Sequence, residues 1–326
     1  MDPSVFKKNK VFPRIIIFII IVAIIVFLIS NCTVSPSTIA KDGNIVIASI
    51  IPVAEFAGKV GGEKIEVFEM VPPGANPHTY EPSPGQLEKV SKAVMYLAVG
   101  SGIDFEIVWL DKILAVNNDT ILVDCSKGIE FIEVSGNGET INSHDDGDTG
   151  GGVVSDESKD GPVGSGRDPH IWLSPKNAAV MVENIYLGLS AMDPENEDYF
   201  YNNKVDFLDE LEMLDSEIRE ILSEKTGKKI LVFHPGWSYF FRDYGLEQIV
   251  VEEDGKEPSP RDMADIIKQA KEAGIKVVLA SPEFSQKSAG VIADEIGGKV
   301  VLISPLARDY VNNLINIAKA FKESME

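Results

Sequence analysis

The feature that most constrains the fold is a twice-repeated alternation of short β-branched runs with helical stretches. Strands that alternate with helices through short turns pair in parallel. The sequence therefore predicts an α/β protein made of two (β/α)4-type domains, each with a parallel four-stranded sheet, and 326 residues give room for both. The predicted strands are 45–49, 65–70, 94–99 and 120–124 in the first set, and 229–233, 248–251, 276–280 and 299–303 in the second.

The region between the two sets is predicted to be helical. Ser174-Pro175 starts one helix, and Asp193-Pro194 starts another that meets no Gly or Pro until Gly227. About 32 residues at 1.5 Å each give roughly 48 Å, which is longer than a small domain is wide. We expect an amino-terminal lobe at 44–192, one long bridging helix at 193–226 and a carboxyl-terminal lobe at 227–326. Two helices broken near Asn202 are the alternative.

The amino end reads as a targeting segment. Four basic residues precede an apolar stretch at 15–29, namely Lys7, Lys8, Lys10 and Arg14. This stretch has the length of a signal-peptide core, whereas a complete membrane span needs about 20 apolar residues. Residues 1–32 are thus predicted to be a secretion signal or a short uncleaved membrane anchor, followed by a linker at 33–43; a buried core helix is the alternative. We expect an extracytoplasmic protein, either periplasmic or attached to the outer face of the cell membrane.

The chain has two cysteines, which are too few for a zinc site built from cysteine ligands. Cys32 directly follows the apolar stretch in L-I-S-N-C, where a lipoprotein carries its lipid-modified cysteine. An unmodified cysteine beside a membrane anchor is the alternative. Cys125 follows an apolar run and is predicted to be a small buried core residue.

The net charge of −21 argues against nucleic acid as a partner, because its phosphates would repel such a surface. Part of the acidity lies in the segment 135–168, which is rich in glycine and acids and has no aromatic residue. Such a composition cannot offset the entropy of ordering, so we expect a disordered accessory loop. His144 lies in this loop, in H-D-D-G-D. It is either a weak cation site or an ordinary solvated residue.

The other three of the four histidines share a setting. His78 lies in P-H-T-Y-E-P, His170 in D-P-H-I-W-L-S-P and His234 in V-F-H-P-G-W, each beside a proline and at or beyond a predicted strand end. Ligand sites of α/β sheets lie at such strand ends. Proline fixes φ, and turns that are fixed in advance reduce the ordering cost of binding. A single loop histidine is more often only hydrogen-bonded, but three in near-identical settings favour a role in ligand binding over that alternative.

Longer motifs extend this pattern over most of the chain. They are, in order, I-V-I-A-S-I-I-P-V-A-E-F-A, V-G-G-E-K-I-E-V, V-P-P-G-A-N-P-H-T-Y-E-P-S-P, D-P-H-I-W-L-S-P-K-N-A, V-F-H-P-G-W-S-Y-F-F-R-D-Y-G-L, S-P-E-F-S-Q-K-S-A and I-S-P-L-A-R-D-Y. With them, residues 44–326 resemble the solute-binding proteins of zinc and manganese ABC importers, the cluster A-I metal-binding family. That family also has a long bridging helix and an acidic or His-rich loop before its second histidine.

The resemblance implies that His78, His170 and His234 are metal ligands and that Asp309 is the fourth. A helix N-cap is the alternative role for Asp309. Three imidazoles and one carboxylate would form a closed four-coordinate zinc shell. Manganese binders of the family place a glutamate where His234 stands, which favours zinc and leaves manganese, or iron, as the alternative. Glu81 and Asp168 are predicted to accept imidazole N–H groups, or else to be ordinary turn residues.

The resemblance further implies a transport function rather than an enzyme. The chain would capture Zn²⁺ in the cleft between its domains and deliver it to a membrane permease and its ATPase, and we expect a monomer. A zinc-dependent hydrolase is the alternative, because three imidazoles can leave a metal position open for water. However, H-E-x-x-H is absent, and four protein ligands would leave no such position. A cell-adhesion role has been attached to relatives, but nothing in the sequence supports it.

Overall fold

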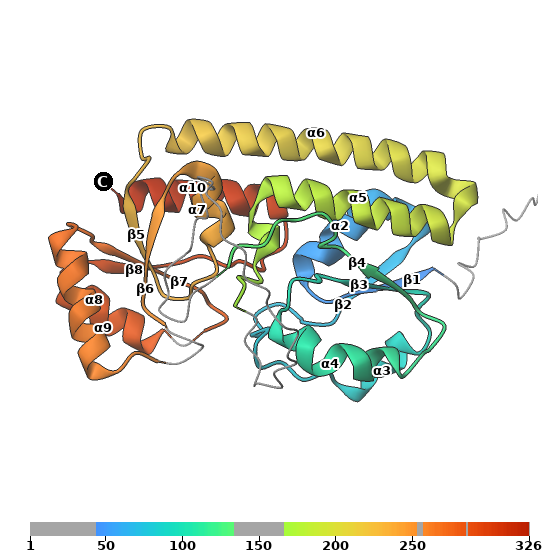
Figure 1. Ribbon diagram of the computed structural model, residues 1–326, viewed down its shortest axis with the longest axis horizontal. Coiled ribbons are helices and arrows are strands. Elements are labelled where there is room, and N and C mark those ends of the chain that lie inside the picture. The colour runs from blue at the N-terminus through green and yellow to red at the C-terminus, as the bar shows by residue number, and fades with distance from the viewer. Residues whose placement is uncertain (1–43, 134–165, 253–256, 285, 326) are drawn as a thin grey trace, which may run out of the picture. The chain divides into compact units, whose positions relative to one another are not determined.

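The computed structural model describes residues 44–133, 166–252, 257–284 and 286–325 (Figure 1). The predicted targeting segment, the linker, Cys32 and His144 lie outside the described residues, as does nearly all of the predicted acidic loop. Among the helices that are described, none combines the length and the hydropathy needed to cross a bilayer.

Two four-stranded sheets organise the chain, as predicted. The first has the strand order β2-β1-β3-β4 and the second β6-β5-β7-β8, and all neighbouring strands are parallel. The inner strands are continuous apolar runs because helices cover both faces of a parallel sheet. The strands are β1 (Ile45–Ala48), β2 (Glu66–Glu69), β3 (Met95–Ala98), β4 (Ile121–Asp124), β5 (Lys229–Val232), β6 (Glu247–Val250), β7 (Val277–Ala280) and β8 (Lys299–Leu302).

The helices begin where the sequence marks their starts. Ser83, Ser174 and Ser259 each accept a hydrogen bond from a first-turn backbone N–H, and a proline follows each of them. Both features stabilise a helix amino terminus. The helices are α2 (Ile51–Gly61), α3 (Pro84–Val90), α4 (Asp104–Leu114), α5 (Pro175–Met192), α6 (Glu197–Leu222), α7 (Ser238–Tyr244), α8 (Pro260–Glu272), α9 (Lys287–Glu295) and α10 (Tyr310–Ser324).

The long helix α6 confirms the predicted bridge. It has 26 residues, or about 39 Å, and it is shorter than predicted because Pro194–Asn196 forms a separate 3₁₀ turn. It continues without a break through Asn202. It contacts α2 and α5 of the amino-terminal half (44–192) and α7 and α10 of the carboxyl-terminal half (227–325), as Figure 1 shows.

One apolar core connects the two halves. Its members come from β1 and β3, from one face of α6, and from β5 and α10, so it is continuous across both sheets. A smaller core fills the space between the second sheet and helices α8 and α9. Cys125 lies fully buried in the first of these, as predicted, and burial raises the pKa of its thiol.

Candidate metal centre

His78 is held by the loop that follows β2. Its backbone N–H donates to Asn76 Oδ1 at 2.8 Å, and the N–H of Thr79 donates to the carbonyl of Asn76. Its ring nitrogen Nδ1 lies 2.7 Å from Oδ2 of Asp104, the first residue of α4. The imidazole is therefore fixed from both its backbone and its side chain.

His170 is held by the residue two positions before it. Asp168 Oδ1 accepts the backbone N–H of His170 at 2.9 Å and lies 2.8 Å from its Nδ1. Tyr239 of α7 donates its hydroxyl to the Asp168 carbonyl, and Ser101 donates to the Pro169 carbonyl at 2.5 Å. The short D-P-H segment is thus fastened to both halves of the chain.

His234 lies two residues beyond the carboxyl end of β5, directly after Phe233. Its Nδ1 lies 3.3 Å from Oε2 of Glu252, which follows the neighbouring strand β6. Phe284, beyond the end of β7, stacks on the His234 ring with centroids 4.2 Å apart and planes 21° from parallel. Gly236 allows close approach, because a Cβ there would lie 3.2 Å from the His170 ring.

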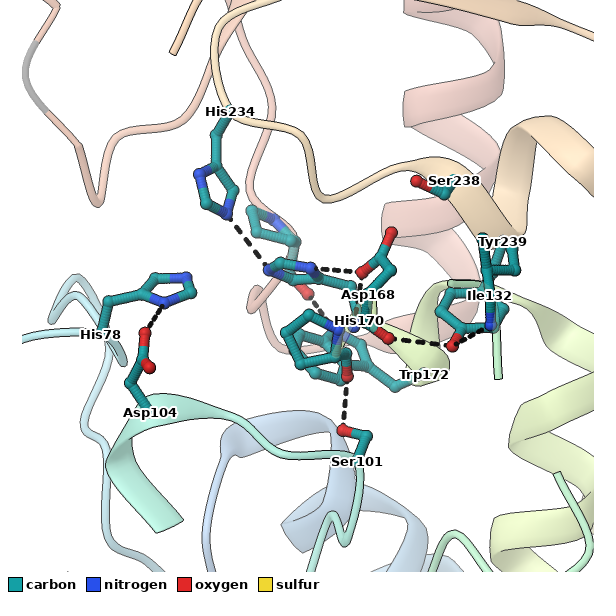
Figure 2. Close-up of polar contacts among 12 residues, drawn as sticks. His78, Ser101, Asp104, Ile132, Asp168, His170, Trp172, His234, Ser238 and Tyr239 are labelled. Atoms are coloured by element: carbon teal, nitrogen blue, oxygen red, sulfur yellow. Dashed lines mark hydrogen bonds and ion pairs between the residues drawn. The ribbon is translucent and has the colours of Figure 1, made fainter. Parts of the chain in front are cut away.

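The three imidazoles converge through their Nε2 atoms (Figure 2). Nε2 of His170 and Nε2 of His234 are 3.2 Å apart, and His78 Nε2 is buried without a hydrogen-bond partner among the described residues. One candidate ligand atom from each histidine lies within 4.8 Å of the others. Since a carboxylate faces each Nδ1, the favoured tautomer has the proton on Nδ1 and a free lone pair on Nε2.

Burial and charge set the protonation of this centre. Burial lowers the pKa of His234 well below its usual value, and the charges of His170 and His78 lower it further. Burial alone would raise the pKa of Asp168, but the charge and hydrogen bonds of His170 outweigh it, and the net shift is downward. Burial raises the pKa of Glu252 to about 7. The His234 imidazole is consequently neutral at pH 7, the form that binds metal.

The donor set, and the separation of two of its three ligand atoms, fit a zinc ion. Zn–N bonds of about 2.0–2.1 Å in tetrahedral geometry place two nitrogen ligands about 3.3 Å apart, and the His170 and His234 Nε2 atoms are 3.2 Å apart. The same separation permits a hydrogen bond between the two rings when one of them carries a proton on Nε2. A bound cation would take the place of that proton.

The structure brings together four of the six residues that the sequence placed in or beside the site: the three histidines and Asp168. Asp309 is exposed at the start of α10, where its Oδ2 accepts from Asn312 Nδ2 at 2.8 Å, and it is outside the histidine group. It occupies the N-cap position, but its side chain makes no capping hydrogen bond. Glu81 is also exposed, and the carboxylate at His78 Nδ1 is that of Asp104.

Sequence reasoning missed Asp104, Glu252 and Phe284. Glu252 and Phe284 lie beyond the carboxyl ends of β6 and β7, in the same sheet as β5, which precedes His234. Asp104 begins α4 after β3, in the same sheet as β2, which precedes His78. Because the carboxyl ends of parallel strands meet at one edge, a search for acids directly after predicted strands would have found Glu252. Asp104, which is the first residue of a helix, carries no comparable signal.

The profile of the family described as zinc-uptake complex component A, periplasmic, matches residues 46–324. The zinc-binding protein AdcA of Streptococcus pyogenes serotype M1 is 30% identical over 286 residues. That alignment covers 86% of this chain and 54% of AdcA, so the chain spans about half of that relative.

Two solved structures are similar over most of the chain. A zinc-bound deletion mutant of ZnuA is 36% identical, with a TM-score of 0.75 and coverage of 87% of this chain and 98% of that one. The laminin-binding protein Lmb of Streptococcus agalactiae, described as having adhesin and metal-transporting activity, is 23% identical, with a TM-score of 0.71 and coverage of 87% and 100%. At that identity the likeness to Lmb supports the fold alone.

Proposed function

Since the chain belongs to the family of periplasmic zinc-uptake component A proteins, we propose that it captures Zn²⁺ with His78, His170 and His234 and delivers it to a membrane permease with its ATPase. The observation that carries this proposal is the convergence of the three Nε2 atoms, each on a ring whose Nδ1 faces a carboxylate. Such outer carboxylates orient the ring and strengthen it as a ligand.

Zinc is favoured over manganese by the donor atoms. Neutral imidazole is a borderline ligand that suits zinc, whereas manganese prefers oxygen-rich octahedral sites. The three carboxylates of the centre are engaged with Nδ1 atoms and do not join the ligand group of the described residues. Manganese or iron would have to bind through three nitrogens and added water.

The fourth position of a tetrahedral shell distinguishes transport from hydrolysis. Asp309 would have to leave Asn312 to fill it, and otherwise a water molecule or a small anion would take that place. An open position on zinc is also the arrangement of hydrolases, and the exposed position of Asp309 is the one observation that favours this second candidate. Zinc-loaded protein should show no turnover of activated esters or peptides if the function is transport.

The cellular setting follows from the same proposal. We infer that the chain works outside the cytoplasm, anchored through residues 1–32, with or without a lipid on Cys32. In that place it would meet zinc before the permease does. Globomycin sensitivity or mass analysis of the mature amino terminus would distinguish a lipidated anchor from an uncleaved one.

A competition titration tests the metal. Purified metal-free protein is titrated with Zn²⁺ and Mn²⁺ against chelators of known affinity, and one tight zinc site with much weaker manganese binding is expected. His78→Gln, His170→Gln and His234→Gln should each weaken zinc binding by orders of magnitude, while His144→Gln serves as the matched control. Unchanged zinc affinity in two of the three cluster variants would overturn the proposal.

A further inference from the structure

Residues 304–310, which connect β8 to α10, form a polar joint with the amino-terminal half. Trp172 Nε1 donates to the Pro305 carbonyl at 2.8 Å, and the Tyr310 hydroxyl donates back to the Trp172 carbonyl at 2.7 Å. The Tyr310 backbone N–H donates to Glu55 Oε1 at 2.9 Å. We call these three hydrogen bonds the joint.

Two of the three hydrogen bonds of the joint, those that involve Trp172, are buried, and the one to Glu55 is partly buried. Trp172 is fully buried and Tyr310 is 2% exposed, and the Tyr310 ring packs edge-on against Phe56 with centroids 4.8 Å apart. A hydrogen bond in such a setting is stronger than at the surface, and a partner left unpaired there is costly. The joint is therefore a firm contact between the two halves, unlike the exposed ion pair of Arg308 with Glu69 nearby.

The backbone at the joint is strained. Asp309 has φ 60° and ψ 61°, and it is the one non-glycine residue with positive φ among the described residues. Such a conformation persists where surrounding contacts over-determine it. Here it precedes Tyr310, whose N–H is an otherwise unpaired donor at the amino end of α10. The Glu55 carboxylate accepts that donor, at the helix end where negative charge is favourable.

The joint lies directly beside the histidines. Trp172 is two residues after His170, and the two rings pack with centroids 5.2 Å apart. The same indole is bonded to Pro305, in the half of the chain that carries His234. The position of His170 relative to His234 is therefore set partly through Trp172.

We propose that Glu55, Trp172 and Tyr310 are positioning residues that hold His170 and His234 at the separation a metal requires before the metal arrives. None of the three belongs to the ligand group. The proposal rests on the proposed function of the histidine site. Ordering that is completed during folding need not be supplied during binding, so the joint raises metal affinity without touching the metal.

Tyr310→Phe tests the joint because it removes one hydroxyl and keeps the ring. Tyr244→Phe is the matched control, since the Tyr244 hydroxyl donates to Asp215 at 2.9 Å and joins α7 to α6 through a hydrogen bond that is not part of the joint. Zinc affinity is measured by chelator competition on the full chain. Tyr310→Phe should raise the zinc Kd about tenfold, the effect usual for residues that orient metal ligands, and Tyr244→Phe should leave it unchanged within error.

Amide hydrogen exchange of the metal-free proteins gives a readout independent of zinc. Tyr310→Phe should speed exchange in 169–173 and 304–310, and zinc should restore protection, whereas Tyr244→Phe should leave both segments unchanged. Equal exchange in the two variants, or equal zinc affinity, would overturn the positioning role. If the unaltered protein does not bind zinc, the proposed function is wrong, and the positioning role with it. If Tyr310→Phe fails to fold, Glu55→Ala, which removes the acceptor of the Tyr310 N–H, is tested against the same outcomes.

Discussion

At the scale of single residues, each histidine has two distinct ends. One ring nitrogen meets a carboxylate at 2.7 to 3.3 Å, and the other faces the shared centre. This arrangement fixes the tautomer and turns three loop side chains into one donor set. The residues that contact the rings therefore help to set the geometry of the donor set.

Asp309→Asn tests whether Asp309 is a metal ligand or only the residue at the N-cap position of α10. Asparagine tolerates the left-handed backbone conformation as aspartate does, and its side-chain oxygen can still accept from Asn312. We expect the zinc Kd to stay within about twofold, because the carboxylate is outside the ligand group and a surface substitution of this kind is nearly neutral. The measurement is chelator competition at pH 7. A loss of affinity comparable to that of His234→Gln would make Asp309 the fourth ligand.

Gly236→Ala probes the close approach to His170. The added Cβ would lie 3.2 to 3.3 Å from three atoms of the imidazole, so the ring must shift and the zinc Kd should rise about tenfold, as for other changes that misorient a ligand. Gly290→Ala is the control. It lies within α9 with no atom within 4 Å of the added Cβ, and should stabilise the fold by about 1 kcal/mol without changing zinc affinity. Equal zinc affinity in the two variants would show that a Cβ at position 236 does not displace the His170 ring.

At the scale of elements, the centre is built from segments beyond strand ends and fastened by the β3–α4 loop. Glu106 of α4 is buried and accepts the N–H groups of Val99 and Gly100 at 2.6 and 3.0 Å. Burial raises its pKa. The loop that it fixes carries Ser101, which contacts Pro169, and Asp104, which contacts His78. One turn of chain therefore supports two ligands.

Deleting residues 136–164 should leave the tight zinc site intact. All three histidines of the centre and their carboxylate partners lie outside that segment, and an antiparallel bridge joins Glu133 to Arg167, which stand on either side of it in the sequence. We expect an unchanged zinc stoichiometry of one tight site in a competition titration. A loss of the tight site would assign His144 or an acid of the segment to the shell.

At the scale of the whole molecule, stability and metal binding are linked through protons. An unfolded histidine binds a proton near pH 6.5, but folded His234 does so only at much lower pH because it is buried. Between these values the unfolded state holds more protons. The free energy of unfolding of the metal-free protein must therefore fall as the pH falls, by up to about 1.4 kcal/mol per pH unit from this residue.

His234→Gln measures that contribution. Denaturant unfolding of both metal-free proteins between pH 7 and pH 5 should show a steeper loss of stability in the unaltered protein. Glu252, whose pKa burial raises to about 7, acts in the opposite direction, and because its carboxylate contacts the His234 ring the difference between the two proteins reports on the pair. Zinc at 100 times its Kd should add about 2.7 kcal/mol to the unaltered protein alone. If the free energy of unfolding falls equally with pH in the unaltered protein and in His234→Gln, His234 is not held neutral by burial.

The sequence by itself determined the order of strands and helices and the settings of the histidines. β-branched runs, serine-proline helix starts and proline-flanked histidines are local signals, and local backbone preferences are expressed wherever packing agrees with them. Asp168 was found for the same reason, since it stands two residues before His170. The helix starts at Ser83, Ser174 and Ser259 likewise needed no tertiary information.

Only the tertiary structure decided which carboxylates meet His78 and His234. Asp104 is 26 residues from His78 and Glu252 is 18 residues from His234, and each pair is made by strands and helices that pack side by side. Asp309 shows the converse, because it stands near the end of β8 in sequence but turns outward at the start of α10. Side-chain direction at such a turn depends on the backbone angles that packing imposes, and spacing along the chain does not contain them.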